Sequence, residues 1–252
     1  MNIIQTIFYT LLGVSFGSFF NVLIDRLPEG KSIISPPSHC DACQRRLSGL
    51  ELIPIASYIF LKGRCRTCQE KISTRSLIVE ILTGVLFLLT WIRFGLSWET
   101  ALYTFYGCVL IIIGGIDLEN QKILNVMIYP AIGLGLIMIP LIHSDQPWMI
   151  LLGGAVGFGV LLLISLIAPG AMGMGDVKLV LFLGFIIGYP KIIITLFLAF
   201  VLGGLVAGVL LALKKIGKKD SIAFGPFLAL AGIITMLYGT QILEWYLRRL
   251  GG

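Results

Sequence analysis

The chain has 252 residues, of which 57% are hydrophobic and only 13% charged. A soluble domain carries about 25% charged residues, so the composition excludes an ordinary soluble protein and predicts a polytopic membrane protein. The net charge of +6 does not indicate nucleic-acid binding, because the basic residues cluster at the ends of apolar runs.

Apolar runs long enough to cross a bilayer, about 20 residues each, recur along the chain. They predict an all-α polytopic fold of about eight transmembrane helices. The sixth run is the shortest, because Pro190 follows it closely. The expected spans lie near residues 3–24, 76–92, 100–116, 123–142, 148–168, 177–189, 190–213 and 222–247. No internal repeat is expected. The glycine-rich stretches "GGAVGFG" and "GGLVAG" predict close packing between helices through small residues.

Charge distribution predicts the orientation. Nine of the 19 Lys/Arg residues fall between Arg26 and Arg75, and four more between Lys214 and Lys219. With eight alternating spans these two regions share one side, which the positive-inside rule assigns to the cytoplasm, with the N-terminus outside. The Lys214–Lys219 cluster is also expected to contact anionic lipids. No basic residue precedes the first run, so it reads as a retained span rather than a cleaved signal peptide.

A cysteine-rich polar segment follows the first span. Each of two C-x-x-C motifs offers two thiolates, and 21 residues separate them, which favours a tetrahedral zinc site. The alternative is a pair of disulfides, which a cytoplasmic location disfavours. Four cysteines close the coordination sphere, so the zinc is expected to be structural. The expected ligands are Cys40, Cys43, Cys65 and Cys68. We thus expect a first helix (1–24), a cytoplasmic zinc-binding loop domain (25–75) and a transmembrane domain (76–252).

Two acidic residues stand at the edges of spans. Asp117 ends the third run, and Asp176 opens the sixth after the glycine-spaced "GMG". Two crossings separate them, so both are expected on the cytoplasmic side, where two close carboxylates would share a proton and act as general base and acid. The alternative for Asp176 is a helix cap, and for Asp117 an interfacial end of its span. Their matching sidedness and the G-x-G-D context favour catalysis.

At these residues the chain resembles the bacterial type IV prepilin peptidase family, which joins leader peptidase and N-methyltransferase activities. The resemblance covers nearly the whole chain, in this order: "GSFFNVLIDRLP", the paired C-x-x-C motifs, "IPIASYIFLKGRCRTC", "STRSLIVE", "IDLENQKILN", "GMGDVKL" and "FGPFLALAG". One departure is Leu124, where the family usually has a proline; it is expected to affect how the fourth helix begins more than the chemistry.

The resemblance implies that Asp117 and Asp176 are the catalytic pair of a membrane aspartic peptidase and that the four cysteines hold zinc. It implies substrates, type IV prepilins or pseudopilins, that are cut at a Gly–Phe type bond on the cytoplasmic face of the inner membrane and then N-methylated with S-adenosylmethionine. Gly63 and Glu80 are candidate methyl-donor residues by position and resemblance only, and a buried polar pairing is the alternative for Glu80. Asn21 is expected either to bridge helices or to touch a ligand.

Other functions remain open at this point. A peptidase without methyl transfer would use the aspartates alone. An ion-coupled transporter would use the same aspartates for coupling and should show inverted repeats, which are not apparent. A zinc-scaffolded adaptor would need only the cysteine loop.

Overall fold

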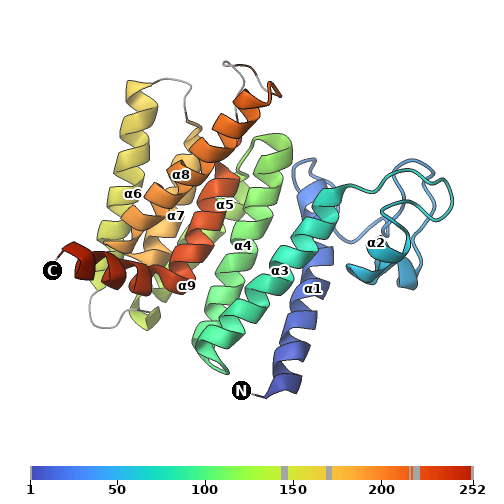
Figure 1. The fold of residues 1–252 in the computed structure, drawn as a ribbon, viewed down its shortest axis with the longest axis horizontal. Coiled ribbons are helices and arrows are strands. Elements are labelled where there is room, and N and C mark those ends of the chain that lie inside the picture. The colour runs from blue at the N-terminus through green and yellow to red at the C-terminus, as the bar shows by residue number, and fades with distance from the viewer. Residues whose placement is uncertain (1, 143–146, 169–171, 216, 218–221, 251–252) are drawn as a thin grey trace. The chain divides into compact units, whose positions relative to one another are not determined.

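A computed structural model describes residues 2–142, 147–168, 172–215, 217 and 222–250. Within these residues the chain is helical, and two isolated β-bridges are its only extended pairings. The chain divides into two compact units, residues 1–112 and 113–252, each considered by itself below. Figure 1 colours the helices in chain order.

The first unit is built on two packed helices, α1 (Ile3–Arg26) and α3 (Thr74–Phe94), followed by most of α4 (Trp98–Asn120). Glycines let α1 and α3 approach closely: Gly13 packs on Phe87, and Gly17 on the backbone of Glu80. Asn21 donates to the carbonyls of Gly17 and Ser76, so it bridges the two helices, which confirms the first of its two expected roles. The chain segment that connects α1 to α3 contains the 3₁₀ helix η1 (Gly49–Leu52) and the short helix α2 (Ala56–Phe60).

The second unit surrounds one short helix, α7 (Met174–Ile187). It contacts α5 (Asn125–Ile142), α6 (Pro147–Ile167), α8 (Lys191–Ala212) and α9 (Gly225–Leu250). Ten of its 14 residues are buried, including Asp176. A helix that is buried on all sides is expected to be apolar on every face and not along one stripe only. The sequence of α7 has this character.

The glycine predictions have mixed outcomes. The stretch at 153–159 does mediate close packing: a Cβ at Gly153 would lie 2.6 Å from the Gly188 backbone, and one at Gly157 would lie 2.6 Å from Val180. In the stretch at 203–208 only Gly203 faces another helix, since its Cβ would lie 3.4 Å from Phe227, whereas a Cβ at Gly204 or Gly208 would meet no atom within 4 Å. Small residues permit a close approach but do not require one.

The expected span count is met only in part. Six described helices are long and apolar enough to cross a membrane: α1, α3, α4, α6, α8 and α9. The runs expected at 123–142 and 177–189 are also helical. However, Asn125–Ile137, the part of α5 whose side chains are described, is shorter, and α7 has 14 residues. The described part of the chain is therefore all-helical, with six candidate membrane spans, as in a multi-pass membrane protein.

Candidate functional sites: a carboxylate pair and a four-cysteine cluster

Asp117 lies near the end of α4, and its carboxylate caps another helix. Its Oδ2 accepts the backbone N–H of Gly225, the first residue of α9, at 2.9 Å. Asp117 is only 5% exposed. A Cβ at Gly225 would lie 2.6 Å from that oxygen, so this approach needs a glycine. Pro226 follows in the first turn, where its missing N–H costs no hydrogen bond.

Asp176 lies in the first turn of α7. The N–H of Gly173 donates to its Oδ2 at 3.3 Å, and the N–H of Asp176 donates back to the Gly173 carbonyl. This reciprocal cap explains why α7 begins where it does and gives the carboxylate the favourable end of the helix dipole. The capping role expected as the alternative is therefore real. It accounts for one oxygen only, because Oδ1 is buried with no hydrogen-bond partner in the described part of the chain.

The two carboxylates lie within electrostatic reach of each other. Asp117 is close enough for its charge to act on the Asp176 carboxyl. The turn after α4 also packs against the first turn of α7, since a Cβ at Gly175 would lie 2.9 Å from Ile123. The second unit thus brings Asp117 and Asp176 together from two helix ends, with one oxygen of each held by a backbone N–H. Buried carboxylates that repel each other share protons readily, as an acid–base pair requires.

A lysine next to this site ties α7 to α5. Lys178 donates to Oδ1 of Asn125 at 2.9 Å and lies over the Tyr129 ring, 4.9 Å from its centroid. The first turn of α5 bonds back to the carbonyl of Leu124. The helix therefore begins at Asn125 without the proline that the family usually has before it. These contacts of Lys178 were not predicted from the sequence, although the lysine stands two residues after Asp176.

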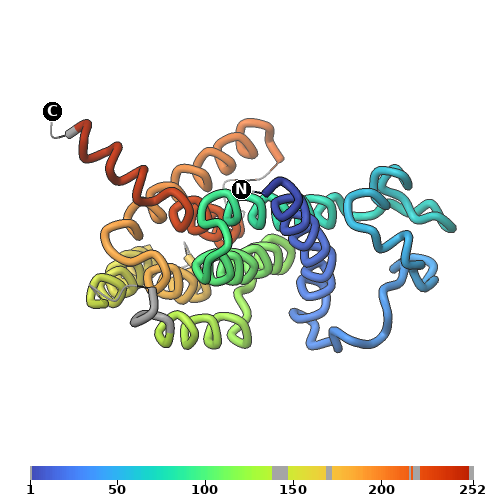
Figure 2. Tube along the Cα trace, turned by 90° about the horizontal axis from the view of Figure 1, so that it is seen from below, coloured from blue at the N-terminus to red at the C-terminus, as the bar shows by residue number. Residues whose placement is uncertain are grey.

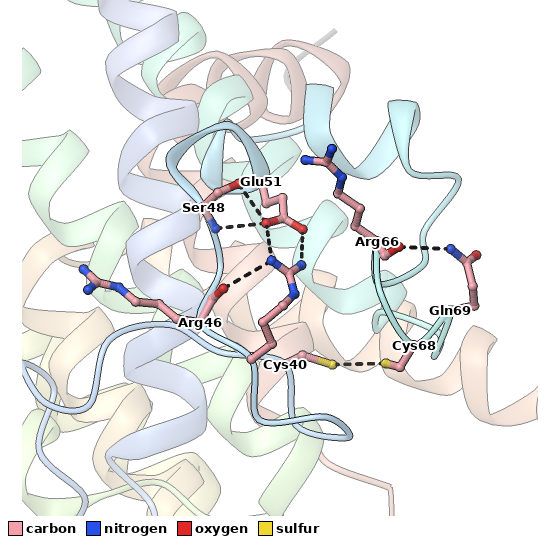
Figure 3. A network of polar contacts seen from close by, with 8 residues as sticks. Cys40, Arg46, Ser48, Glu51, Arg66, Cys68 and Gln69 are labelled. Carbon is pink, nitrogen blue, oxygen red and sulfur yellow. Dashed lines mark hydrogen bonds and ion pairs between the residues drawn. The ribbon is translucent and has the colours of Figure 1, made fainter.

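The four cysteines of the loop gather in the first unit. Their Sγ atoms all lie within 4.8 Å of one another, and those of Cys40 and Cys68 are 3.7 Å apart (Figure 3). Tetrahedral zinc with bonds of about 2.3 Å separates its sulfur ligands by about 3.8 Å. None of the cysteines is bridged. Backbone N–H groups of Cys68 and Thr67 lower the pKa of Cys65 to about 6, which favours the thiolate that binds metal. The donor set fits a structural zinc ion.

Each C-x-x-C motif forms the same small turn. The N–H of Cys40 donates to the Arg45 carbonyl, and that of Cys65 donates to Glu70. Gln44 and Gln69 both adopt positive φ, at 56° and 60°, and both donate through the side chain to the carbonyl three residues earlier. Figure 3 shows the second of these bonds, from Gln69 to Arg66. The expectation of no internal repeat is therefore wrong at this scale. The repeated C-x-x-C-Q could have revealed it.

An ion pair supports the first turn. Arg45 forms a two-pronged contact with Glu51, at 2.5 and 3.1 Å. Glu51 in turn caps η1 through the N–H and hydroxyl of Ser48 (Figure 3). These donors lower the pKa of Glu51 to about 2. The pair holds the segment between the two motifs against the cluster, as outer-shell contacts of metal sites commonly do.

The two candidate methyl-donor residues contact protein groups. Gly63 has φ 66° and is buried under the Tyr58 ring, where a Cβ would lie 2.8 Å from the ring carbon. Oε2 of Glu80 accepts the N–H of Ile55 at 2.7 Å, a buried pairing of the kind weighed as its alternative role. In this arrangement neither residue by itself forms a site for a cofactor.

Comparison with known proteins agrees with these features. Residues 11–94 match the bacterial peptidase A24 N-terminal domain, and residues 104–208 match the type IV leader peptidase family. The chain is similar to the prepilin leader peptidase/N-methyltransferases of Bacillus subtilis (33% identity over 94% of this chain and 96% of the relative) and Stutzerimonas stutzeri (30%, 94% and 92%). That of Pseudomonas putida is 31% identical over 96% and 93%. No solved structure matches significantly.

These matches span both units and define a membrane peptidase. The chain belongs to the prepilin leader peptidase/N-methyltransferase family.

Proposed function

We propose that this enzyme cleaves the leader of type IV prepilins or pseudopilins with Asp117 and Asp176, and then methylates the new N-terminus. The observation that carries the proposal is the carboxylate pair, buried and within electrostatic reach, in a chain of this family. The substrates are those named by the relatives, and the scissile bond is of the Gly–Phe type that the resemblance implies.

The proposed cleavage needs only water and the two carboxyl groups. One ionised aspartate removes a proton from water as the water attacks the scissile carbonyl, and the protonated partner donates a hydrogen bond to the carbonyl oxygen. The tetrahedral intermediate then collapses as the C–N bond breaks and a proton passes to the departing amine. The N–H of Gly225 orients Asp117, and the N–H of Gly173 orients Asp176.

Cys40, Cys43, Cys65 and Cys68 would hold zinc in the loop of residues 25–75, where it would cross-link the two turns. Zinc bound by four thiolates has no open position for substrate. Its proposed role is therefore to hold the loop together rather than to take part in cleavage.

Methyl transfer from S-adenosylmethionine is proposed from the family alone. Gly63 and Glu80 remain candidates for holding the methyl donor, although both contact protein groups as described. Positive Lys/Arg clustering supports eight spans, including α5 and α7, with residues 25–75 and both aspartates on the cytoplasmic side of the inner membrane.

The test is purified full-length enzyme with a prepilin peptide, with and without S-adenosylmethionine, followed by mass spectrometry. We expect cleavage after the glycine in both reactions and a one-methyl mass increase only with the cofactor. Cleavage without methylation would support a peptidase alone. No cleavage by enzyme that keeps its zinc and its fold would contradict the proposal.

A further inference from the structure

The short helix α2 is fixed to a membrane span by one buried hydrogen bond. Glu80 of α3 is 8% exposed, and it accepts the N–H of Ile55, the residue before α2. Ile55 has φ 60° and ψ −53°, a conformation that a β-branched residue rarely adopts. Because the surroundings must hold such a residue in place, the bond to Glu80 determines where α2 starts.

That bond sets the depth of α2 along the spans. Glu80 is six residues into α3 from Thr74, about 9 Å along a helix that rises about 1.5 Å per residue. Gly17 of α1 also packs on the Glu80 backbone, and Gly17 is nine residues, about 14 Å, before the end of α1 at Arg26. Ile55 therefore lies level with the second turn of α3 rather than beyond the ends of the two spans. In Figures 1 and 2 the segment with α2 lies beside the α1–α3 pair.

The surface that this segment presents is apolar. Phe60 is 84% exposed, Leu50 74% and Ile59 63%, and Leu52 and Ile53 are also exposed. Large apolar side chains exposed at neighbouring positions of a short polar loop indicate a contact surface. At the depth given by Glu80, the surroundings of a membrane span are the headgroup region and the first part of the acyl chains.

Basic residues flank this apolar surface. Lys62, Arg64, Arg66 and Lys71 are exposed directly after α2. Three acids of the same segment already have basic partners, in the pairs Glu51–Arg45, Asp25–Arg75 and Glu29–Lys31. The excess positive charge next to exposed apolar side chains is complementary to anionic phospholipid headgroups above acyl chains.

We propose that residues 50–60 are inserted into the adjacent lipid leaflet. In this arrangement Phe60 and Ile59 contact acyl chains, while Lys62 and Arg64 contact anionic headgroups. Residues 50–60 are then a membrane-embedded element tied to α3, and not a part of the loop that stands in the aqueous phase. The inference depends on the membrane location of α1 and α3 and is independent of the reaction that the enzyme performs.

Photo-crosslinking tests it. The photoreactive residue p-benzoylphenylalanine replaces Phe60 in the full-length protein, reconstituted in nanodiscs of phosphatidylethanolamine and phosphatidylglycerol, and mass spectrometry identifies the adducts. We expect phospholipid adducts at a yield similar to that of the same substitution at Phe8, which is 62% exposed on α1. Position Gln69, exposed on the second cysteine turn, is the matched control and should give at least tenfold fewer.

Three further variants test the cause. Glu80→Leu removes the acceptor for Ile55, whereas Glu80→Gln keeps one, so only the first should lower the yield at position 60. At position 60 we expect more adducts with the anionic phosphatidylglycerol than with phosphatidylethanolamine. The double substitution Lys62→Gln and Arg64→Gln should remove this difference. The proposal is overturned if position 60 gives no lipid adduct while position 8 does, or if it reacts instead with a second copy or with added prepilin.

Discussion

The backbone N–H of Gly225 donates a 2.9 Å hydrogen bond to Oδ2 of Asp117, although 108 residues separate the two. The start of α9 thereby orients one member of the carboxylate pair. This contact explains the motif "FGP". The glycine lets the Asp117 carboxylate approach the start of α9, and the proline follows in the first turn of that helix.

Gly225→Ala should lower the rate of prepilin cleavage by about 100-fold, since a shift of a catalytic group by about 1 Å costs about that much. The added Cβ would lie 2.6 Å from the carboxylate oxygen, so Asp117 or α9 must move. Gly208→Ala in α8 is the control, because its Cβ would meet no atom within 4 Å. Equal rates for the two variants would show that this contact does not orient the aspartate.

Asp117→Asn and Asp176→Asn should each lower the rate of peptide cleavage by about 10³-fold or more, the scale of general acid–base catalysis. Asparagine keeps the shape of the side chain and an acceptor for the N–H of Gly225 or Gly173, but it cannot exchange the proton. Single-turnover assays of detergent-purified variants measure the loss, and retention of zinc verifies folding of the loop. An active asparagine variant would remove that aspartate from the mechanism.

Cys65→Ser should release the bound zinc. Cys65 is the buried member of the cluster, and loss of one thiolate leaves an incomplete tetrahedral set. Metal analysis of the purified protein is the measurement. Cys108→Ser, outside the cluster, should leave the metal content unchanged. An unchanged zinc content in the Cys65→Ser variant would mean that the metal binds elsewhere in the protein.

Glu51→Gln should speed the removal of zinc by a chelator about two- to fivefold, the scale expected for a partly exposed ion pair. The pKa of Glu51 is lowered to about 2, so its contribution is complete above the ordinary carboxyl pKa of 4.5 and is lost only as the pH falls toward 2. The ratio of the two rates should therefore be the same at pH 7 as at pH 5.5. Glu70→Gln, exposed on the second turn, should behave like the unchanged protein.

Gly153→Ala should lower the thermal denaturation midpoint, because its Cβ would lie 2.6 Å from the Gly188 backbone, and overpacking of this kind costs about 1–3 kcal/mol. Gly159→Ala, in the same helix with open space at its Cβ, should be neutral or slightly stabilising. If both substitutions lowered the thermal denaturation midpoint equally, close packing between α6 and α7 would not be the cause of the loss of stability.

The helices themselves could be predicted from sequence because each apolar run is a local signal. The span expected at 76–92 corresponds to the helix Thr74–Phe94, and the span expected at 148–168 corresponds to the helix Pro147–Ile167. The spacing of the cysteines likewise predicted a cluster that the folded chain forms.

Long-range contacts could not be predicted in the same way. Nothing near Asp117 indicates that Gly225 will donate to it, or that Glu80 will hold Ile55, since both bonds depend on how distant helices pack. The helix α2 was also not predicted, because five residues are too few to show a helical periodicity in the sequence.

The duplicated cysteine turns have a consequence for metal exchange. Each turn closes through main-chain bonds of its own, between Cys40 and Arg45 in one and between Cys65 and Glu70 in the other. Loss of the proposed ion would therefore separate the two turns without breaking the main-chain bond that closes each of them. Rebinding requires only that the two turns meet again, and the entropy of closing so short a connection is small. A loop of this construction can regain its ion quickly after a brief loss and return to the same shape.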